Sequence, residues 1–371
     1  MLEEKKSVKV FGIAFDPDEY LGAIERQLYI ALLKSGVDYL KSIFDPYDLL
    51  IPYIEEAIGS NRVIRLGKIP VESWLSPKPD LEDEELINIE NYSTFIDANG
   101  CKEYANYVEE FVQKIMDESS IPLMIGIDHS MSGGMIRALS KKYGAENLSV
   151  IVLDSHLDAI PTSIRYKLFT SLKKKRHPLL FLPDEFYIST DSYDPLVFER
   201  PDSYNKGSFL YYLIKEQILL PKNLWVVGVQ DHPTEDLLRE EDPNLKSYLE
   251  AYLNLENEGV NIITNNEIMK AKNFVNKLDA ISTQFLYISF DVDVGCGSSI
   301  TLARCLPNEK GLYEHDLYNL ARMIRENMKK KKVNLVGLDV MEIDIHYLRP
   351  NDNTPLIIAN TIKCLLGAND A

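Results

Sequence analysis

The sequence predicts an α/β protein with a single three-layer α/β/α domain built around a mainly parallel sheet of roughly eight strands. Short apolar runs rich in β-branched residues alternate with longer amphipathic stretches, which is typical of strands joined by crossover helices. The short runs are apolar throughout, as expected for strands that helices cover on both faces. No repeat or low-complexity linker divides the 371 residues, so we expect one domain over residues 1–371.

Each expected element is a segment with one of these two patterns. The expected strands are Lys9–Phe15, Val63–Leu66, Leu123–Ile127, Ser149–Leu153, Leu224–Val229, Val260–Thr264, Leu286–Phe290 and Leu335–Met341. The expected helices are Tyr20–Phe44, Glu103–Asp117, Gly133–Tyr143, Gly207–Leu219, Asn244–Asn257, Ile268–Leu278, Glu314–Lys329 and Thr354–Leu365.

Two stretches interrupt the alternation. Pro70–Gly100 is polar and acidic, and we expect a surface excursion there. Ala159–Asn205 is long and contains the basic run Lys173–Arg176. Loops of this length in compact domains are often functional, so 159–205 is predicted to be a long loop or lid insertion near the site. A decorative insertion or an oligomer contact is an equally open interpretation.

Composition restricts the partners. The formal net charge of −17 argues against nucleic-acid binding, which needs Lys and Arg to meet phosphates. The same charge suits a cationic substrate, although plain solubility explains it equally well. Four scattered cysteines without a CxxC pair, a charged N-terminal stretch and the absence of a long apolar run predict a cytoplasmic protein that does not interact with membranes.

Three segments each end an apolar run with side chains that bind metals: Ile125–Ser130 (IGIDHS), Val152–Asp158 (VLDSHLD) and Ser289–Asp293 (SFDVD). Alternate residues of a strand point to one face, and ligands of parallel α/β sheets bind beyond the carboxyl ends of the strands. The segments are therefore expected to converge. The candidate metal ligands are His129, Asp154, His156, Asp158, Asp291 and Asp293.

This ligand set indicates a particular metal chemistry. It is rich in carboxylate oxygen, contains two imidazoles and lacks thiolate, which favours Mn²⁺ over Zn²⁺, Fe²⁺ or Co²⁺. A single D-x-D at a strand end is usually a turn or a cap, so the prediction depends on all three segments together. Two divalent ions about 3.5–4 Å apart lower the pKa of a bridging water and so supply a hydroxide for hydrolysis.

These segments resemble the motifs of the ureohydrolase superfamily, which includes arginase, agmatinase and formiminoglutamase. Gly126–Ser130 (GIDHS) resembles the first motif, Gly-Gly-Asp-His-Ser, and Asp154–Asp158 (DSHLD) the second, Asp-Ala-His-x-Asp. Ser289–Asp293 (SFDVD) matches the third, Ser-Phe-Asp-x-Asp, and Gly337–Ile343 (GLDVMEI) resembles a weaker fourth. Motif order and rough spacing agree over nearly the whole chain.

The resemblance implies a binuclear manganese hydrolase with two Mn²⁺ per subunit that cleaves a guanidino C–N bond through a metal-bridging hydroxide and releases urea. It places His129 and Asp158 on one metal, His156 and Asp293 on the other, and Asp154 and Asp291 as bridges.

The resemblance also implies substrate and assembly. Glu342 would pair with the guanidinium of a small cationic substrate, and Asp158 would help to stabilise the tetrahedral intermediate. The family further suggests a homo-oligomer, a trimer or hexamer.

Besides the length of Ala159–Asn205, which leaves the substrate open, the chain departs from the family motifs in two places. Gly295–Gly297 stands where an Asp-Pro is expected, so Cys296 either lies near the metals or is a small buried side chain. The family's His-Gly segment has its nearest match in Asn205–Ser208, without the histidine thought to shuttle protons. Lys206 or His346 are the candidate catalytic replacements, Asn205 is a candidate substrate-binding residue, and each has an ordinary surface role as its alternative.

Two other functions stay open at this point. One is a formiminoglutamase-like hydrolase acting on a formimino C–N bond. The other is a metal-binding, non-catalytic member of the family, which the two departures motivate.

Overall fold

The computed structural model describes residues 6–19, 21–34, 45–175, 200–233, 239, 241–268, 270–305 and 310–367. Its centre is an eight-stranded sheet with the order β2-β1-β3-β8-β7-β4-β5-β6. All of the pairings between neighbouring strands are parallel. The expected strand number is therefore confirmed, and the sheet is parallel at every described pairing.

The strands agree with the predicted runs to within a few residues at each end. They are β1 (Ser7–Ile13), β2 (Val63–Lys68), β3 (Ser120–Gly126), β4 (Leu148–Leu153), β5 (Leu224–Val229), β6 (Asn261–Thr264), β7 (Phe285–Asp291) and β8 (Asn334–Met341). Every residue of β3, β4 and β5 is buried, as expected for strands covered on both faces.

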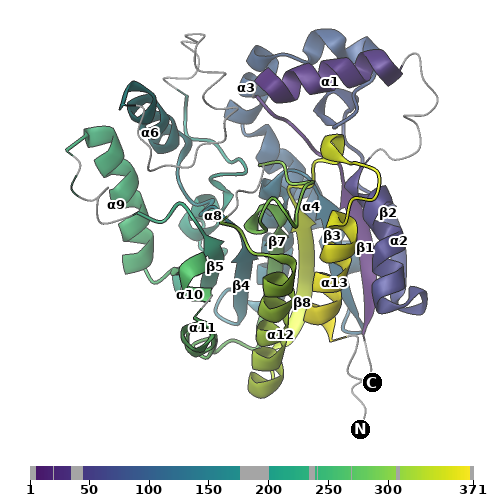
Figure 1. Ribbon diagram of the computed structural model, residues 1–371, viewed down its shortest axis with the longest axis vertical. Coiled ribbons are helices and arrows are strands. Elements are labelled where there is room, and N and C mark those ends of the chain that lie inside the picture. Colours follow the sequence, from purple (N-terminus) through teal and green to yellow (C-terminus); the bar gives the residue numbers. More distant parts are fainter. Residues whose placement is uncertain are drawn as a thin grey trace.

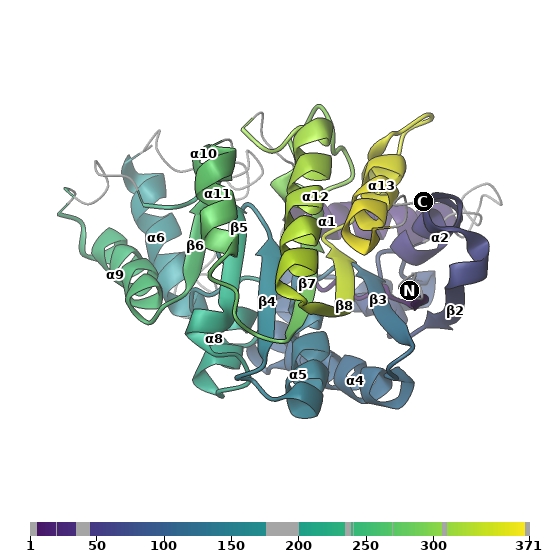
Figure 2. The same ribbon diagram turned by 90° about the horizontal axis from the view of Figure 1, so that it is seen from below.

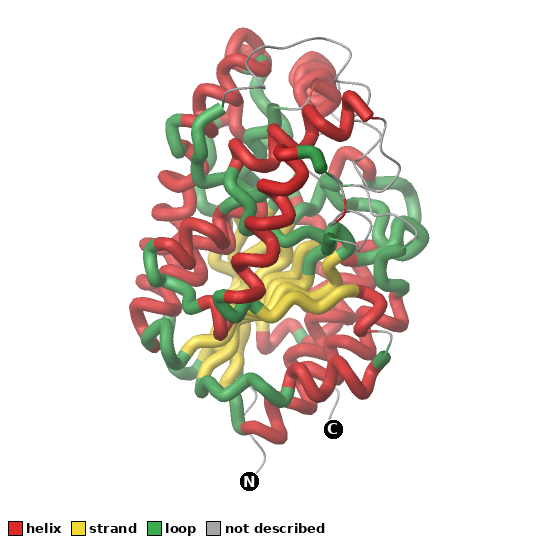
Figure 3. The backbone as a smooth tube through the Cα atoms, turned by 90° about the vertical axis from the view of Figure 1, so that its left-hand side faces the viewer, coloured by secondary structure: helices red, strands yellow, loops and turns green. Residues whose placement is uncertain are grey.

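Helices cover both faces of the sheet, so the molecule has three layers (Figures 1 and 2). On one face lie α2 (Pro46–Ile58), α11 (Ala271–Leu278), α12 (Glu314–Lys331) and α13 (Thr354–Leu366). On the other face lie α4 (Gly100–Ile115), α5 (Ser132–Tyr143) and α8 (Phe209–Lys215). Figure 3 shows the twisted sheet enclosed between these helices.

The remaining helices lie around this sandwich. They are α1 (Leu21–Lys34), α3 (Ile89–Asp97), α6 (Thr162–Lys175), α9 (Pro243–Asn257) and α10 (Asn265–Ile268). In Figure 1, α1, α3 and α6 lie above the sheet, beyond one end of its strands.

The alternation of side chains along each strand divides the core in two. Val150 and Val152 of β4 belong to the cluster that packs against α4, α5 and α8, whereas Ile151 and Leu153 belong to the cluster under α2, α12 and α13. Successive strand residues point to opposite faces, so a fully apolar strand supplies both cores.

Two stretches that were expected to be loops contain helices. The expected surface excursion at 70–100 contains α3, and its Leu75, Tyr92 and Ile96 are buried, so that stretch is part of the core on one side. The stretch 159–205 begins with α6 rather than a loop, and residues 176–199 lie outside the described part of the chain. A lid role for 159–205 stays a prediction.

None of the described helices is long and apolar enough to cross a membrane.

Candidate metal centre

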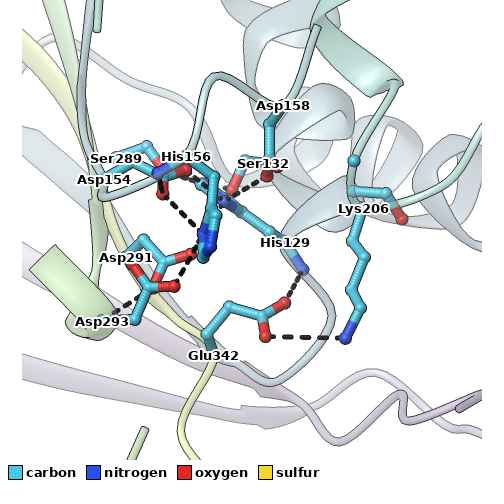
Figure 4. A network of polar contacts seen from close by, with 12 residues as sticks. His129, Ser132, Asp154, His156, Asp158, Lys206, Ser289, Asp291, Asp293 and Glu342 are labelled. Carbon is cyan, nitrogen blue, oxygen red and sulfur yellow. Dashed lines mark hydrogen bonds and ion pairs between the residues drawn. The ribbon is translucent and has the colours of Figure 1, made fainter. Parts of the chain in front are cut away.

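The three segments predicted to bind metal follow strands that are neighbours in the middle of the sheet. Strands β3, β8, β7 and β4 are contiguous, with β8 and β7 inserted between the half that holds β1 and the half that holds β5. Such a change in strand order leaves room for a ligand beyond the carboxyl ends. The side chains brought together there are His129, Asp154, His156, Asp158, Asp291, Asp293 and Glu342 (Figure 4).

The first cluster surrounds one nitrogen of His129. Its Nδ1 lies 3.0 Å from Asp158 Oδ2, 3.2 Å from Asp291 Oδ2 and 3.3 Å from Asp154 Oδ2. The imidazole is fully buried. Three carboxylates therefore face a single buried ring nitrogen, an arrangement that a cation would stabilise.

The second cluster is centred on His156. Its Nδ1 lies 2.9 Å from Asp293 Oδ2 and 3.5 Å from Asp154 Oδ1. Ser155 Oγ donates a hydrogen bond of 2.9 Å to the other oxygen of Asp293, which fixes that carboxylate. Asp154 thus contributes one oxygen to each cluster, as a ligand shared by two ions would.

The donor atoms of both clusters fit a pair of divalent ions. His129, Asp154 and Asp291 present ligand atoms within 4.8 Å of one another, and so do Asp154, His156 and Asp293. Three of these buried atoms have no hydrogen-bond partner among the described residues: Nδ1 of His129 and the Oδ2 atoms of Asp154 and Asp293. Buried polar groups normally have partners, so these atoms indicate a missing ligand.

The pKa values of the clustered side chains also favour bound cations. Burial raises the pKa of Asp291 well above its ordinary value, and the charges of Asp293 and Asp154 raise it further. Burial alone would lower the pKa of His129, but the surrounding carboxylates raise it well above its ordinary value. These directions indicate that the clustered anions favour a positive charge among them, which bound protons would supply. Divalent cations would replace the protons.

A hydrogen-bonded chain behind His129 fixes which of its nitrogens faces the cluster. Nε2 of His129 lies 2.9 Å from Ser289 Oγ, and Ser289 Oγ donates a 2.7 Å bond to Asp339 Oδ1. The hydroxyl of Tyr287 bonds to the other oxygen of Asp339. Such outer partners orient a ligating imidazole, and here they leave Nδ1 for the metal.

The local backbone is shaped by the same carboxylates. Asp154 Oδ1 accepts the amide of His156 at 2.6 Å, and Asp291 Oδ1 accepts the amide of Asp293 at 2.8 Å. Asp158 and Glu342 have φ angles of 50° and 61°, in the left-handed region that non-glycine residues rarely adopt. Strained positions of this kind cluster at functional sites.

Glu342 lies at the end of β8, beside the first cluster. Its Oε1 accepts the amide of His129 at 3.1 Å, and its Oε2 is buried without a hydrogen-bond partner among the described residues. Burial raises the pKa of Glu342 to about 7, although the charge of Lys206 lowers it.

The segment that replaces the family's His-Gly reaches this glutamate. Nζ of Lys206 lies 3.8 Å from Glu342 Oε2 and 3.7 Å from Asp18 Oδ2. Asn205 is occupied by contacts with α6: its Oδ1 accepts Arg165 Nη2 at 2.7 Å, and its Nδ2 donates to Thr162 Oγ1 at 2.9 Å.

A sequence profile described as "Arginase family" matches residues 59–367, which is most of the chain. The chain belongs to the arginase family. Two curated agmatinases, from Bacillus cereus and Bacillus anthracis, are each 28% identical to this arginase-family chain over 113 residues. That match spans only 38% of each agmatinase and 30% of this chain.

Solved structures share the fold across nearly the whole chain. Agmatine ureohydrolase of Thermoplasma volcanium is 16% identical with a TM-score of 0.53, covering 99% of this chain and 91% of its own. Proclavaminate amidino hydrolase from Streptomyces clavuligerus is 17% identical with a TM-score of 0.55, covering 98% and 92%. Arginase from Bacillus caldovelox is 17% identical with a TM-score of 0.55, covering 98% of both chains. At such identities the likeness establishes the fold alone.

Among the predicted catalytic residues of this arginase-family protein, His346 lies in a different setting. Its Nδ1 lies 2.7 Å from Asp344 Oδ1 and its Nε2 lies 2.9 Å from the carbonyl of Pro77. Both ring nitrogens therefore serve structural contacts, and we propose no catalytic role for His346.

The structure adds a buried charge network that the sequence reasoning missed. Arg304 Nη2 lies 2.7 Å from Asp16 Oδ1 and 2.7 Å from Asp18 Oδ2, and Nη1 lies 3.6 Å from Asp344 Oδ2. These residues follow β1, β7 and β8, so the network ties three loops together beside Lys206. The available signal was the D-x-D at Asp16 and Asp18 directly after the first expected strand.

The cysteine associated with the metal centre is also not the one considered from sequence. Cys296 is buried, and its sulfur lies 3.0 Å from Ser298 Oγ, which fits the small buried side chain. Cys305 instead lies within electrostatic range of His156 and Glu342, and burial raises its thiol pKa above the ordinary value.

Proposed function

We propose that this protein is a binuclear manganese-dependent hydrolase that cleaves the C–N bond of a small guanidino compound and releases urea. The observation that carries the proposal is the shared carboxylate of Asp154, which faces His129 with one oxygen and His156 with the other. A single carboxylate between two histidine-containing clusters is the ligand arrangement of a two-metal site.

The proposed metal ligands are the six residues predicted from the sequence: His129, Asp154, His156, Asp158, Asp291 and Asp293. Their oxygen and imidazole donors, with no thiolate among them, suit Mn²⁺. Two such ions would supply a nucleophilic hydroxide at neutral pH and polarise the bond under attack.

The protein's own groups would position the substrate. Glu342 is placed to accept the donor fork of a guanidinium, because one of its oxygens is held by the His129 amide and the other has no hydrogen-bond partner among the described residues. Asp158 faces the same space with its side chain 13% exposed and would stabilise the tetrahedral intermediate by accepting a hydrogen bond from it. Lys206 is the proposed donor of the proton to the leaving amine, because its ammonium stands beside Glu342.

Urea release tests the function directly. Protein loaded with Mn²⁺ is incubated with arginine, agmatine, guanidinobutyrate, guanidinopropionate and guanidine. We expect urea from at least one of them and none after exhaustive chelation. Ammonia or formamide from a formimino substrate without any urea would move the assignment to the formiminoglutamase-like alternative, and full activity after chelation would refute the metal mechanism.

The variant Asp154→Asn separates an enzyme from a non-catalytic metal protein. Loss of the shared oxygen should lower turnover at least about a hundredfold, because even outer-sphere changes cost 10–100-fold. If the wild-type protein binds Mn²⁺ and is stabilised by it but no substrate turns over, the non-catalytic alternative holds. Asp117→Asn, which changes an exposed carboxylate in the loop before β3, is the matched control.

Assembly and location belong to the same proposal. We propose a homo-oligomer, a trimer or hexamer, acting in the cytoplasm. Sedimentation equilibrium of the purified protein tests the assembly, and a monomer at micromolar concentration would contradict it.

A further inference from the structure

A small cavity adjoins the candidate metal centre on the side of Lys206. Its volume is about 40 Å³. Lys206 and Asp128 form one part of the wall, Arg165 and Tyr166 of α6 another, and Asp18 and Glu19 a third. Because one water needs about 10–15 Å³, the cavity has room for roughly three or four waters, enough for one carboxylate group.

The acidic groups of this wall already have strong partners. Asp18 Oδ2 accepts Nε and Nη2 of Arg304 at 2.9 and 2.7 Å. Glu19 Oε1 lies 2.5 Å from Nη1 of Arg200. Asp128 Oδ1 accepts the amide of Ser130 at 3.0 Å. Asp18 and Glu19 therefore face arginine charges from behind the cavity, whereas Asp128 is bonded to the neutral Ser130 and the second oxygen of Glu19 has no hydrogen-bond partner among the described residues.

The guanidinium of Arg165 is in the opposite situation. It donates one hydrogen bond, from Nη2 to the neutral amide oxygen of Asn205 at 2.7 Å. Within the described residues it forms no ion pair with a carboxylate, and its buried Nε has no hydrogen-bond partner. A buried arginine donor left without an acceptor is costly, so the group is placed for a ligand.

The fold holds Arg165 in this position. A Cβ at residue 207 would lie 1.7 Å from Nη1 of Arg165, so only glycine leaves room for the guanidinium at Gly207. Arg165 is also in the first turn of α6, whose amino-terminal end adds positive potential to the same wall.

We propose that Arg165 binds a carboxylate at the far end of the substrate, so that the enzyme acts on guanidino acids in preference to guanidino amines. The inference rests on the proposed function, in which Glu342 holds the guanidinium. Lys206 lies 3.8 Å from Glu342 and also lines the cavity, so it adds a second positive charge to the wall that holds Arg165. An arginine fork matches a carboxylate in two parallel hydrogen bonds, which gives selectivity as well as affinity.

Three substrates of similar length isolate the effect of the tail: guanidinobutyrate carries a carboxylate, agmatine an ammonium and butylguanidine a methyl group. We expect the wild-type protein to favour guanidinobutyrate over agmatine by at least about tenfold in kcat/KM. Arg165→Met should reduce kcat/KM for guanidinobutyrate at least about thirtyfold, mostly through KM, and change butylguanidine less than about threefold. Arg165→Lys should fall between, because it keeps the charge without the fork.

Two further variants control the interpretation. Gly207→Ala leaves Arg165 in the chain but displaces its guanidinium, so it should reproduce the selective loss for guanidinobutyrate. Arg322→Met removes an exposed arginine on α12 and should leave all three substrates unchanged.

Different results would contradict the carboxylate site and the proposed hydrolase function. Urea from agmatine or butylguanidine in preference to guanidinobutyrate, or an equal loss for all substrates in Arg165→Met, would overturn the inference and leave the hydrolase standing. If no substrate turns over, thermal stabilisation of the manganese-loaded protein by guanidinobutyrate decides instead. Stabilisation that Arg165→Met abolishes supports the carboxylate site, and no stabilisation of the wild-type protein overturns it.

Discussion

At the scale of single residues, the centre depends on carboxylates and imidazoles whose orientation is fixed by neutral groups. Ser289 is the clearest case, because its hydroxyl lies between Nε2 of His129 and the carboxylate of Asp339. In the sequence, Ser289 is part of the third motif, and no separate role was predicted for it. The alternation of Asp154, His156 and Asp158 predicted their convergence, whereas the Ser289–Asp339 contact joins neighbouring strands whose register the sequence does not state.

Ser289→Ala should therefore weaken metal binding without removing a ligand. Loss of the hydroxyl frees His129 to rotate or to change tautomer, and outer-sphere changes of this kind cost about 10–100-fold in metal affinity. Titration calorimetry with Mn²⁺ measures the change, and Ser247→Ala at a partly exposed serine of α9 is the control. An unchanged affinity in Ser289→Ala would show that packing alone orients the ring.

Asp344 gives the clearest dependence on pH. Burial alone would raise its pKa, but the hydrogen bond with His346 and the charge of Arg304 lower it below the ordinary value. A carboxylate with a lowered folded-state pKa stabilises the protein above its unfolded-state pKa near 4 and loses that contribution as the pH falls further.

Asp344→Asn should accordingly lower the free energy of unfolding by about 3–5 kcal/mol at pH 7, because it leaves buried cations without their partner. The difference from the wild-type protein should shrink when the pH is lowered towards about 3. Urea unfolding at both pH values measures it. Asp48→Asn, at a 44%-exposed carboxylate paired with Lys68, should change stability by less than about 1 kcal/mol, and an equal effect of the two substitutions would contradict the assignment.

At the scale of elements, the sheet was predictable and some of its surroundings were not. Apolar runs identified all eight strands: β3, β4 and β5 are buried throughout and have little sequence freedom, whereas β2 has no fully buried residue. The helix α2 was missed: it contains Pro52 in its interior and starts with Pro46, features that argue against a helix from sequence alone. The helix α3 was missed because its acidic lead-in has the composition of a surface loop, while Tyr92 is buried by contacts that only the folded chain supplies.

The close packing of α4 against α5 can be tested by substitution. A Cβ on Gly134 would lie 2.3 Å from the carbonyl oxygen of Ala105, so the two helices approach closely at this glycine. Gly134→Ala should lower the free energy of unfolding by about 1–3 kcal/mol through overpacking. Gly22→Ala in α1, where the nearest atom is 3.7 Å away, should be neutral or slightly stabilising. Denaturant unfolding compares them, and equal stability of the two variants would contradict the packing account.

At the scale of the whole molecule, the fold collects its ligands from segments far apart in the chain. His129 and Asp293 are separated by more than a hundred residues, yet they follow β3 and β7, which are separated only by β8 in the middle of the sheet. Motif order predicted the set of ligands, since the carboxyl ends of parallel strands share one edge. The cavity and Arg165 could not be predicted, because they depend on how α6 and the loop around Gly207 pack over that edge.

The central claim is that these strand ends hold two metal ions. The most direct measurement is a crystal structure of the Mn²⁺-loaded protein with anomalous diffraction at the manganese edge. We predict two anomalous peaks about 3.5–4 Å apart, with Asp154 in contact with both and one histidine on each. A single peak, or peaks away from His129 and His156, would contradict the account.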